Sequence, residues 1–496
     1  MTVMVTGAVR RVRRVRSRAS RVSNRSLRLL SPRPAPLRRC LCCKKVILDK
    51  DGRMVNGVVF DAVNAALADL CREFRELNTG HLATYIPPLA RADPSDFGIA
   101  LTSADGHRYR AGEANKPFTI QSVSKPFVLA LALSELGAAE VFRRVGAEPS
   151  GEPFNAISLD PETGRPANPM INAGAIATTA LVPAATSELR FSRILETLGR
   201  FAGRSLDVDE EVYRAEAATG DRNIALAHLM RAAGSLTGAP SAALDVYFRQ
   251  CAILVDATDL AVMAATLANE GVNPVTGARV VPAPVTVQVL AVMATCGMYD
   301  GSGDWLLRVG LPAKSGVSGG LVAISPGRSG AGCYSPLLDA AGNPVRAVAA
   351  LAELSRELGL HMMHTSPPGT PTITHPGLSD GSDGAAGRRA GGEMAPGELP
   401  AWVAARGELD FTAAEKLVHT LAERLLEVSR GRAVVDLVDV TVVRPAAERL
   451  VLAVLERLTA MGHLIGFVGD VAVPFSTRGV LLASRSAAVD WVRMHS

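Results

Sequence analysis

A serine and a lysine three residues apart, Ser122 and Lys125, are the sharpest candidates for chemistry in this sequence. They lie in the segment QSVSKP, whose Pro126 suits the first turn of a helix, where a missing N–H does little harm. Residues three apart at the start of a helix share one face. Serine needs an adjacent base to act as a nucleophile, and a lysine serves when burial and positive neighbours lower its pKa. The pair therefore predicts a serine nucleophile, although many such strings are solvated helix surface.

A second segment, Lys314 to Gly320 (KSGVSGG), strengthens this interpretation because it falls on a predicted strand. In serine hydrolases of the Ser-x-x-Lys type, a Lys-Thr/Ser-Gly strand edges the active site. Glycines there let the backbone approach a substrate, and a strand-edge N–H can donate to an oxyanion. The alternative is a glycine-rich bulge beside a turn. The two segments together favour a serine acyl-transfer enzyme.

The elements that must position these segments follow from the spacing of apolar residues. Val58 to Leu77 shows helical spacing, and the region from Ser124 to about Leu307 is mostly helical. Strand patterns occur on both sides of that region, at Phe97 to Leu101, His107 to Ala111, Gly310 to Ile324 and Val345 to Leu351. We therefore expect an α+β domain whose sheet is built from both ends of its sequence.

A second unit is predicted after a segment rich in glycine and proline. Residues from about 364 to 400 show no periodicity, which is typical of a flexible linker. Strands and helices then alternate, with strands at Trp402 to Ala405, Ala433 to Val438 and Leu464 to Val468, and helices at Ala413 to Val428 and Pro445 to Met461. This order predicts a small α/β domain.

Charge is distributed unevenly along the 496 residues. Residues 1–50 hold twelve arginines and three lysines against one acid, Asp49, whereas the rest of the chain is mildly acidic although the whole carries +5. We expect residues 1–53 to form a basic disordered tail, which is either a targeting or anion-binding arm or an extension ahead of a true start near Met54. Nothing in the acidic body suggests a nucleic-acid surface.

The lengths of the apolar runs and the spacing of cysteines and histidines disfavour several other classes of protein. No strictly apolar run of 18 residues occurs, so we expect no membrane span, and Val280 to Met298 suits a buried helix. Seven cysteines at scattered spacings form no disulfide framework, which favours a reducing, cytoplasmic location. The cluster Cys40, Cys42 and Cys43 lacks partners at zinc-site spacing. His81, His107 and His228 show neither metal-site nor catalytic-triad spacing, so no metal site is expected.

Residues from about 58 to 357 resemble the serine-dependent glutaminase family, whose fold is similar to that of β-lactamases and penicillin-binding proteins. Seven stretches carry the resemblance in order: Tyr85 to Leu89, Gln121 to Pro126, Asn168 to Ile176, Glu216 to Asn223, Asp245 to Cys251, Cys296 to Asp300, and Lys314 to Gly320. The resemblance implies a β-lactamase-like serine hydrolase domain. It also implies hydrolysis of the side-chain amide of L-glutamine to L-glutamate and ammonia, without metal or cofactor.

The roles that this resemblance implies are assigned residue by residue. Ser122 would be the nucleophile and Lys125 its base, and Tyr85 and Tyr299 would assist proton transfer to the leaving ammonia. The substrate would be held by Asn172, Glu216, Asn223 and Tyr247, and the backbone N–H groups of Ser122 and Val317 would form the oxyanion hole. A carboxylate such as Glu216 suits the α-ammonium of a zwitterion. Without the resemblance, we would interpret Glu216 as a solvent-exposed acid on a helix, Tyr247 as a residue packed in the core, and Asn172 as a turn or helix cap.

The C-terminal unit resembles a STAS domain of the anti-sigma-factor-antagonist type. The residues that carry the likeness are Gly407 to Phe411 and Ala433 to Thr441. In phosphorylated members a Ser or Thr opens the helix after the second of these strands. Here Arg444-Pro445-Ala446-Ala447 occupies that place, so no hydroxyl is present to modify. A docking, dimerising or ligand-binding role remains open.

The expected organisation is a basic tail at 1–53, a glutaminase domain at 54–360, a linker at 361–400 and a STAS domain at 401–496. By analogy with the family we expect a homo-oligomer, a dimer or tetramer, with a possible protein partner for the STAS domain. The rival hypotheses are another β-lactamase-like acyl hydrolase and a catalytically inactive binding protein. Glu216 and Asn223 argue against the first, and the Ser122, Lys125 and Tyr299 set argues against the second.

Overall fold

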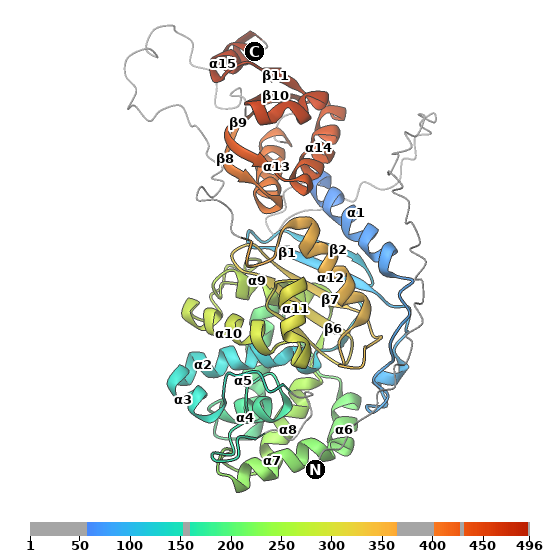
Figure 1. Ribbon diagram of the computed structural model, residues 1–496, viewed down its shortest axis with the longest axis vertical. Coiled ribbons are helices and arrows are strands. Elements are labelled where there is room, and N and C mark those ends of the chain that lie inside the picture. The colour runs from blue at the N-terminus through green and yellow to red at the C-terminus, as the bar shows by residue number, and fades with distance from the viewer. Residues whose placement is uncertain (1–56, 152–158, 365–400, 427–430, 495–496) are drawn as a thin grey trace, which may run out of the picture.

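The computed structural model describes residues 57–151, 159–364, 401–426 and 431–494, arranged as two units joined through a shared core (Figure 1). The expected basic tail lies outside the described residues, as does the expected linker beyond His364. In the described part of the chain, every helix is too short or too polar to span a bilayer.

The first unit is built on a five-stranded antiparallel sheet with the strand order β2-β1-β7-β6-β5. The strands come from both ends of the unit's sequence, as predicted, with β1 at Gly98–Ser103, β2 at Arg108–Gly112, β5 at Ala313–Ser315, β6 at Gly320–Ser325 and β7 at Ser329–Tyr334. Two further short strands, β3 (Phe118–Thr119) and β4 (Leu254–Val255), pair with each other beside it.

Helices cover both faces of this sheet. On one face α1 (Gly57–Phe74) and α12 (Val345–Leu358) pack against Ile99, Leu321 and Cys333, and on the other α9 (Ala257–Ala268) packs against Ala100 and Val322. Helix α11 (Ser302–Arg308) contributes Trp305 to the same core as α1 and α12. The remaining helices form the body below α9 in Figure 1: α2 (Lys125–Leu136), α3 (Ala138–Arg144), α4 (Asn172–Leu181), α5 (Ser187–Ala202), α6 (Glu210–Thr219), α7 (Asp221–Ala232), α8 (Pro240–Cys251) and α10 (Ala283–Cys296). The prediction of a long helical insertion is confirmed.

Two predictions about the sheet are wrong. Val345 to Leu351, expected as a strand, begins helix α12, because its buried residues Ala347, Ala350, Leu351 and Leu354 recur at helical spacing. Strand β7 was not predicted, since its sequence SGAGCY is rich in small residues. The glycines have a packing role: a Cβ on Gly330 would lie 2.1 Å from the backbone nitrogen of Ala265 in α9.

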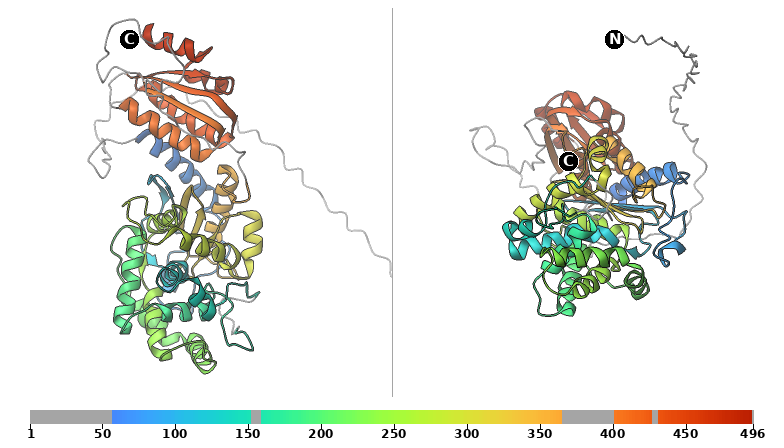
Figure 2. Two further views of the ribbon diagram at one scale, coloured as in Figure 1. Left: turned by 90° about the vertical axis from the view of Figure 1, so that its left-hand side faces the viewer. Right: turned by 60° about the horizontal axis from the view of Figure 1, so that its bottom comes forward.

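The second unit is a four-stranded parallel sheet with the order β11-β10-β9-β8, as expected for a small α/β domain. Its elements are β8 (Ala401–Leu409), α13 (Phe411–Leu426), β9 (Arg432–Val443), α14 (Pro445–Ala460), β10 (Leu464–Val468), β11 (Val480–Leu482) and α15 (Arg485–Met494). Strand β11 and helix α15 extend the predicted set. Helices α13 and α14 lie on one face of the sheet, and α15 lies on the other (Figure 2).

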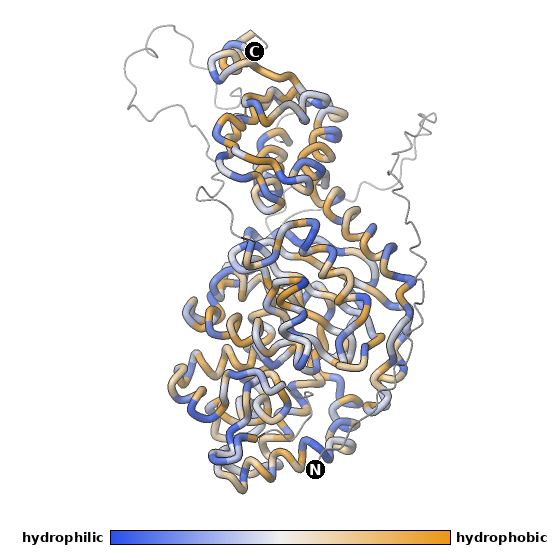
Figure 3. Tube along the Cα trace, viewed as in Figure 1, coloured by the Kyte–Doolittle hydropathy of each residue, from blue (hydrophilic) through white to orange (hydrophobic). Residues whose placement is uncertain are grey.

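Helix α1 connects the two units. It packs against β2 in the first unit and against α13 and α14 in the second, and hydrophobic residues alternate with hydrophilic ones along it (Figure 3). The Phe60 ring lies 5.4 Å from the His419 ring of α13, and Asp61 pairs with Arg457 of α14 at 3.2 Å. A single apolar core therefore runs through both units.

Candidate active site

Ser122 lies on a tight turn, Gln121–Ser124, that leads directly into the buried helix α2. Ser122 is 6% exposed and Lys125 is 1% exposed. The preceding residue, Gln121, has a φ of 50°, which is the left-handed region that non-glycine residues rarely adopt. Such strain persists only where the surroundings enforce it, and it is concentrated at functional sites.

Lys125 is held by neutral acceptors in a dry environment. Its ammonium nitrogen donates to Met170 O at 3.0 Å and to Asn172 Oδ1 at 2.8 Å. Burial lowers the pKa of Lys125 to about 7, because the charged form has lost its water. A substantial fraction of the amine is therefore neutral near pH 7, which is what a general base requires.

Tyr299 lies next to Ser122 and, like Gln121, has a positive φ, 58°. Its side chain shares a hydrogen bond with Ser122, and its hydroxyl donates to Ser315 O at 3.3 Å. Burial raises the pKa of Tyr299 to about 12, so the hydroxyl keeps its proton at neutral pH. The nitrogen of Lys314 lies 3.8 Å from the centre of its ring.

The glycine-rich segment after β5 closes against the turn that carries Ser122. Gly316 N donates to Gly320 O at 2.8 Å, and Ser318 Oγ donates to Thr119 O at 2.6 Å. A Cβ on Gly316 would lie 3.1 Å from Ile120 O, so the two backbones approach closely. Val317, at the tip of this segment, is buried and faces the same cavity as Ser122.

That cavity has a volume of about 180 Å³ and brings together most of the predicted site residues. Its lining includes Tyr85, Ser122, Asn172, Glu216, Asn223, Tyr247 and Val317. Lys125 and Tyr299 lie behind the wall, where they bond to Asn172 and Ser122. Tyr85 is 55% exposed and Glu216 is 7% exposed.

The polar wall of the cavity contains two hydrogen-bonded groups. Asn172 Nδ2 donates to Asn223 Oδ1 at 3.0 Å, and the Tyr247 hydroxyl donates to Asn172 Oδ1 at 3.3 Å. Glu216 accepts a hydrogen bond from Gln121 Nε2 at 2.5 Å. Burial raises the pKa of Glu216 to about 7, against the lowering effects of the Gln121 bond and the charge of Lys125. This carboxyl is therefore poised to become fully charged when a cation arrives.

Several lining residues received no role from the sequence. Gln121 lies next to the serine, and its link to Glu216 crosses 95 positions of sequence, so spacing could not reveal it. Arg222 also lines the cavity, beside Asn223. Cys251, treated as a small buried residue, is buried as expected and reaches the cavity wall, where burial raises its pKa well above the usual range. That thiol is unreactive at neutral pH.

Comparisons with known proteins agree on one family. The family model described as Glutaminase matches residues 80–363. Glutaminase 1 of Bradyrhizobium diazoefficiens is 52% identical over 299 residues, which are 60% of this chain and 49% of that protein. The glutaminase of Corynebacterium glutamicum is 40% identical over 401 residues, which are 80% of this chain and 91% of that protein. The chain thus spans about half the length of the Bradyrhizobium relatives and most of the Corynebacterium one.

Solved structures give the same result for the fold. The crystal structure of Mglu superposes with a TM-score of 0.60 at 39% identity, covering 82% of this chain and 97% of its own. A probable glutaminase from Bacillus subtilis gives a TM-score of 0.57 at 32% identity, covering 61% of this chain and 98% of its own. The longer Mglu match extends beyond the region of the family model.

Proposed function

Because the chain belongs to the glutaminase family, we propose that it hydrolyses the side-chain amide of L-glutamine to L-glutamate and ammonia through a serine acyl-enzyme. The observation that carries the proposal is that Ser122 and a buried carboxyl line one small cavity, with a buried lysine of lowered pKa directly behind its wall. The first pair supplies the chemistry, and the carboxyl supplies recognition of a free amino acid.

In the first half-reaction Ser122 Oγ attacks the amide carbon of the substrate, and its proton passes to the Lys125 amine. The oxyanion that forms accepts from the backbone N–H groups of Ser122 and Val317, the two segments that the Ser318–Thr119 bond holds together. The C–N bond then breaks, and ammonia leaves with a proton delivered through Tyr299, assisted by Tyr85 at the cavity mouth. Water attacks the ester, releases glutamate and restores the serine.

The other lining residues hold the zwitterion. The carboxylate of Glu216 faces the α-ammonium, and bringing that cation into the dry site favours the ionised carboxyl. Asn172, Asn223 and Tyr247 offer amide and hydroxyl donors to the α-carboxylate. Arg222, on the same wall, adds a positive charge suited to that group.

The direct test is ammonia release from glutamine by the full chain and by Ser122→Ala. We expect the substitution to abolish ammonia release while circular dichroism and thermal unfolding stay those of the wild type. Asparagine and the β-lactam nitrocefin serve as comparison substrates. Turnover retained in Ser122→Ala would refute the nucleophile, and nitrocefin turnover exceeding that of glutamine would favour the rival acyl hydrolase.

For the C-terminal unit we propose a STAS domain that acts by docking or dimerising. Its four-stranded parallel sheet, with helices α13 and α14 on one face, supports this assignment. Pro445, preceded by Arg444, opens α14 where phosphorylated members carry a hydroxyl, so control by phosphorylation at that position is not proposed. Size-exclusion chromatography with light scattering tests the accompanying proposal of a homo-oligomer, a dimer or tetramer.

A further inference from the structure

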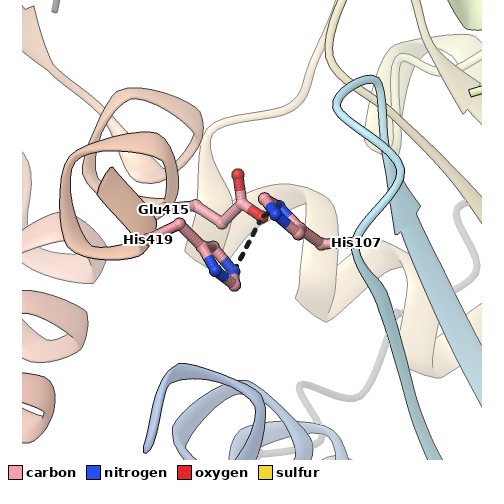
Figure 4. Close-up of side chains that lie close together, drawn as sticks. All are labelled: His107, Glu415 and His419. Atoms are coloured by element: carbon pink, nitrogen blue, oxygen red, sulfur yellow. Dashed lines mark hydrogen bonds and ion pairs between the residues drawn. The ribbon is translucent and has the colours of Figure 1, made fainter. Parts of the chain in front are cut away.

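A cluster of metal-ligating side chains lies where the two units meet, away from the cavity described above. His107 follows the turn between β1 and β2, while Glu415 and His419 lie four residues apart on α13 (Figure 4). Residues four apart share one face of a helix, so α13 presents a carboxylate and an imidazole together. Figure 4 shows the Glu415 carboxylate beside the His107 ring, with a dashed line joining it to the His419 ring.

The distances in this cluster are those of a compact donor set. Glu415 Oε1 lies 2.8 Å from His107 Nδ1 and 3.5 Å from His419 Nε2, and the two rings stack with centroids 3.5 Å apart. The Tyr109 hydroxyl lies 2.6 Å from Glu415 Oε1 and 2.7 Å from His419 Nε2. Two nitrogens and two oxygens therefore surround one small volume.

The electrostatics of the cluster favour a cation. The side chains of Glu415 and His419 are 2% and 3% exposed, and among the described residues the ion pairs of Glu415 are with the two histidines alone. The neighbouring Lys416 points elsewhere and pairs with Asp105 at 3.6 Å. A buried carboxylate is costly unless it is paired and hydrogen-bonded, and a bound cation would supply a full positive charge inside this cluster.

We propose that His107, Glu415 and His419 bind one divalent transition-metal ion, with the Tyr109 hydroxyl as fourth ligand. Zinc and the other divalent transition metals of the first row bind imidazole nitrogens together with carboxylate oxygens. Metal–ligand bonds of about 2.0–2.1 Å in a tetrahedron put ligand atoms roughly 3.3 Å apart. The separations given above bracket this value, so the donor atoms are already at ligand spacing. The two stacked rings must rotate for both nitrogen lone pairs to point at the ion.

The ion would join a hairpin of the first unit to a helix of the second. Its ligands are separated by 308 positions of sequence, so binding opposes separation of the two units rather than acting on the reacting atoms. The site is independent of the proposed function, because none of its residues lines the cavity that holds Ser122.

The test uses the full chain, stripped with a chelator and then titrated with zinc by calorimetry. We expect the wild type to bind one more zinc per chain than His107→Ala or His419→Ala, as counted by elemental analysis. Zinc should also raise the Tm of the wild type and leave the Tm of both variants unchanged, since a ligand that binds only the folded state stabilises it. His228→Ala, which removes an exposed histidine on α7, is the matched control and should behave as the wild type.

All variants are made in a background with Cys40, Cys42 and Cys43 replaced by serine, so that thiols do not contribute zinc binding. Ammonia release by His107→Ala should equal that of its parent, which shows that the variant is folded. His107 is partly exposed on a hairpin, so its variant decides the question even if His419→Ala fails to fold. Equal zinc content and equal zinc-dependent Tm in the parent and His107→Ala would overturn the proposal.

Discussion

Asn172 Oδ1 accepts a hydrogen bond from Lys125 Nζ at 2.8 Å, so the buried amine faces a neutral amide where a carboxylate of almost the same shape would fit. The same amide bonds to Asn223 across the cavity wall. One side chain thus touches both the proposed base and the proposed substrate site. Because this partner is neutral, it does not offset the effect of burial, which lowers the pKa of Lys125.

Asn172→Asp should move the pH profile. A carboxylate at this distance raises the pKa of Lys125 by about 1–3 units, because it stabilises the ammonium form. The rising limb of kcat/KM should shift to higher pH by at least one unit, with about a fivefold or greater loss at pH 7. Asn172→Ala is the control and should lose activity without an upward shift. A limb that stays in place in Asn172→Asp would contradict the assignment of Lys125 as base.

In the wild type, kcat/KM should rise with pH through about pH 7. Lys125 must lose a proton to act as a base, and Glu216 must lose one to attract the α-ammonium. Both groups therefore contribute in the same direction, and log(kcat/KM) should approach a slope of two on the acid side. Initial rates of ammonia release between pH 5 and pH 9 measure the slope. A flat profile over this range would exclude both assignments.

Glu216→Gln should weaken substrate binding and stabilise the fold. The KM for glutamine should rise about 100-fold, because the partner of the α-ammonium loses its charge. The folded-state pKa of Glu216 is raised to about 7, so ionisation opposes folding increasingly from its unfolded value near 4.5 up to about 7. Above pH 7 the free energy of unfolding of the variant should exceed that of the wild type by up to roughly 3 kcal/mol, and below pH 4 the two should be equal. Urea unfolding of both proteins at pH 8 and at pH 4 measures this difference in free energy of unfolding. A variant less stable than the wild type at pH 8 would contradict the raised pKa of Glu216.

Tyr299→Phe should lower kcat by about 10²- to 10⁴-fold with little change in KM, since it removes the hydroxyl that passes a proton. The loss of its bond to Ser315 O should cost about 1 kcal/mol of stability. Tyr334→Phe, at an equally buried tyrosine of β7, is the matched control and should leave kcat unchanged. Equal kcat in Tyr299→Phe and wild type would remove Tyr299 from the mechanism.

A chain that ends at His364 should be less stable than the full chain. Truncation uncovers the face of α1 around Phe60 that packs on α13 and α14, and exposed apolar patches promote association. We expect a lower Tm and aggregation on gel filtration. A truncated chain with the Tm of the full chain would show that the core of the first unit is complete by itself.

Sequence patterns predicted the elements well where one rule applied. The helical spacing of Val59, Val63 and Leu67 marks α1, and alternating strands and helices mark the C-terminal unit. Strand β7 was missed because close packing on α9 selects glycine there, against the usual strand preference. Val345 to Leu351 was misassigned because a short apolar run does not distinguish a strand from the start of a helix.

The site was accessible from the sequence only in part. Ser122 and Lys125 are neighbours on one turn, so their spacing is informative. Gln121 with Glu216, and His107 with Glu415, are brought together by tertiary packing over 95 and 308 positions. No local pattern encodes such pairs, and this is why His107 showed no metal-site spacing in the sequence.

Gln121 and Tyr299 are two of the three non-glycine residues with a positive φ in the described part of the chain, and they flank the same serine. Glycine would relieve the strain at either position, so selection for heat resistance alone would favour it. The same change would remove the Glu216 partner or the hydroxyl beside Ser122. Directed evolution for thermal stability would therefore lower turnover through these two positions first. A screen must select for thermal stability and for activity together.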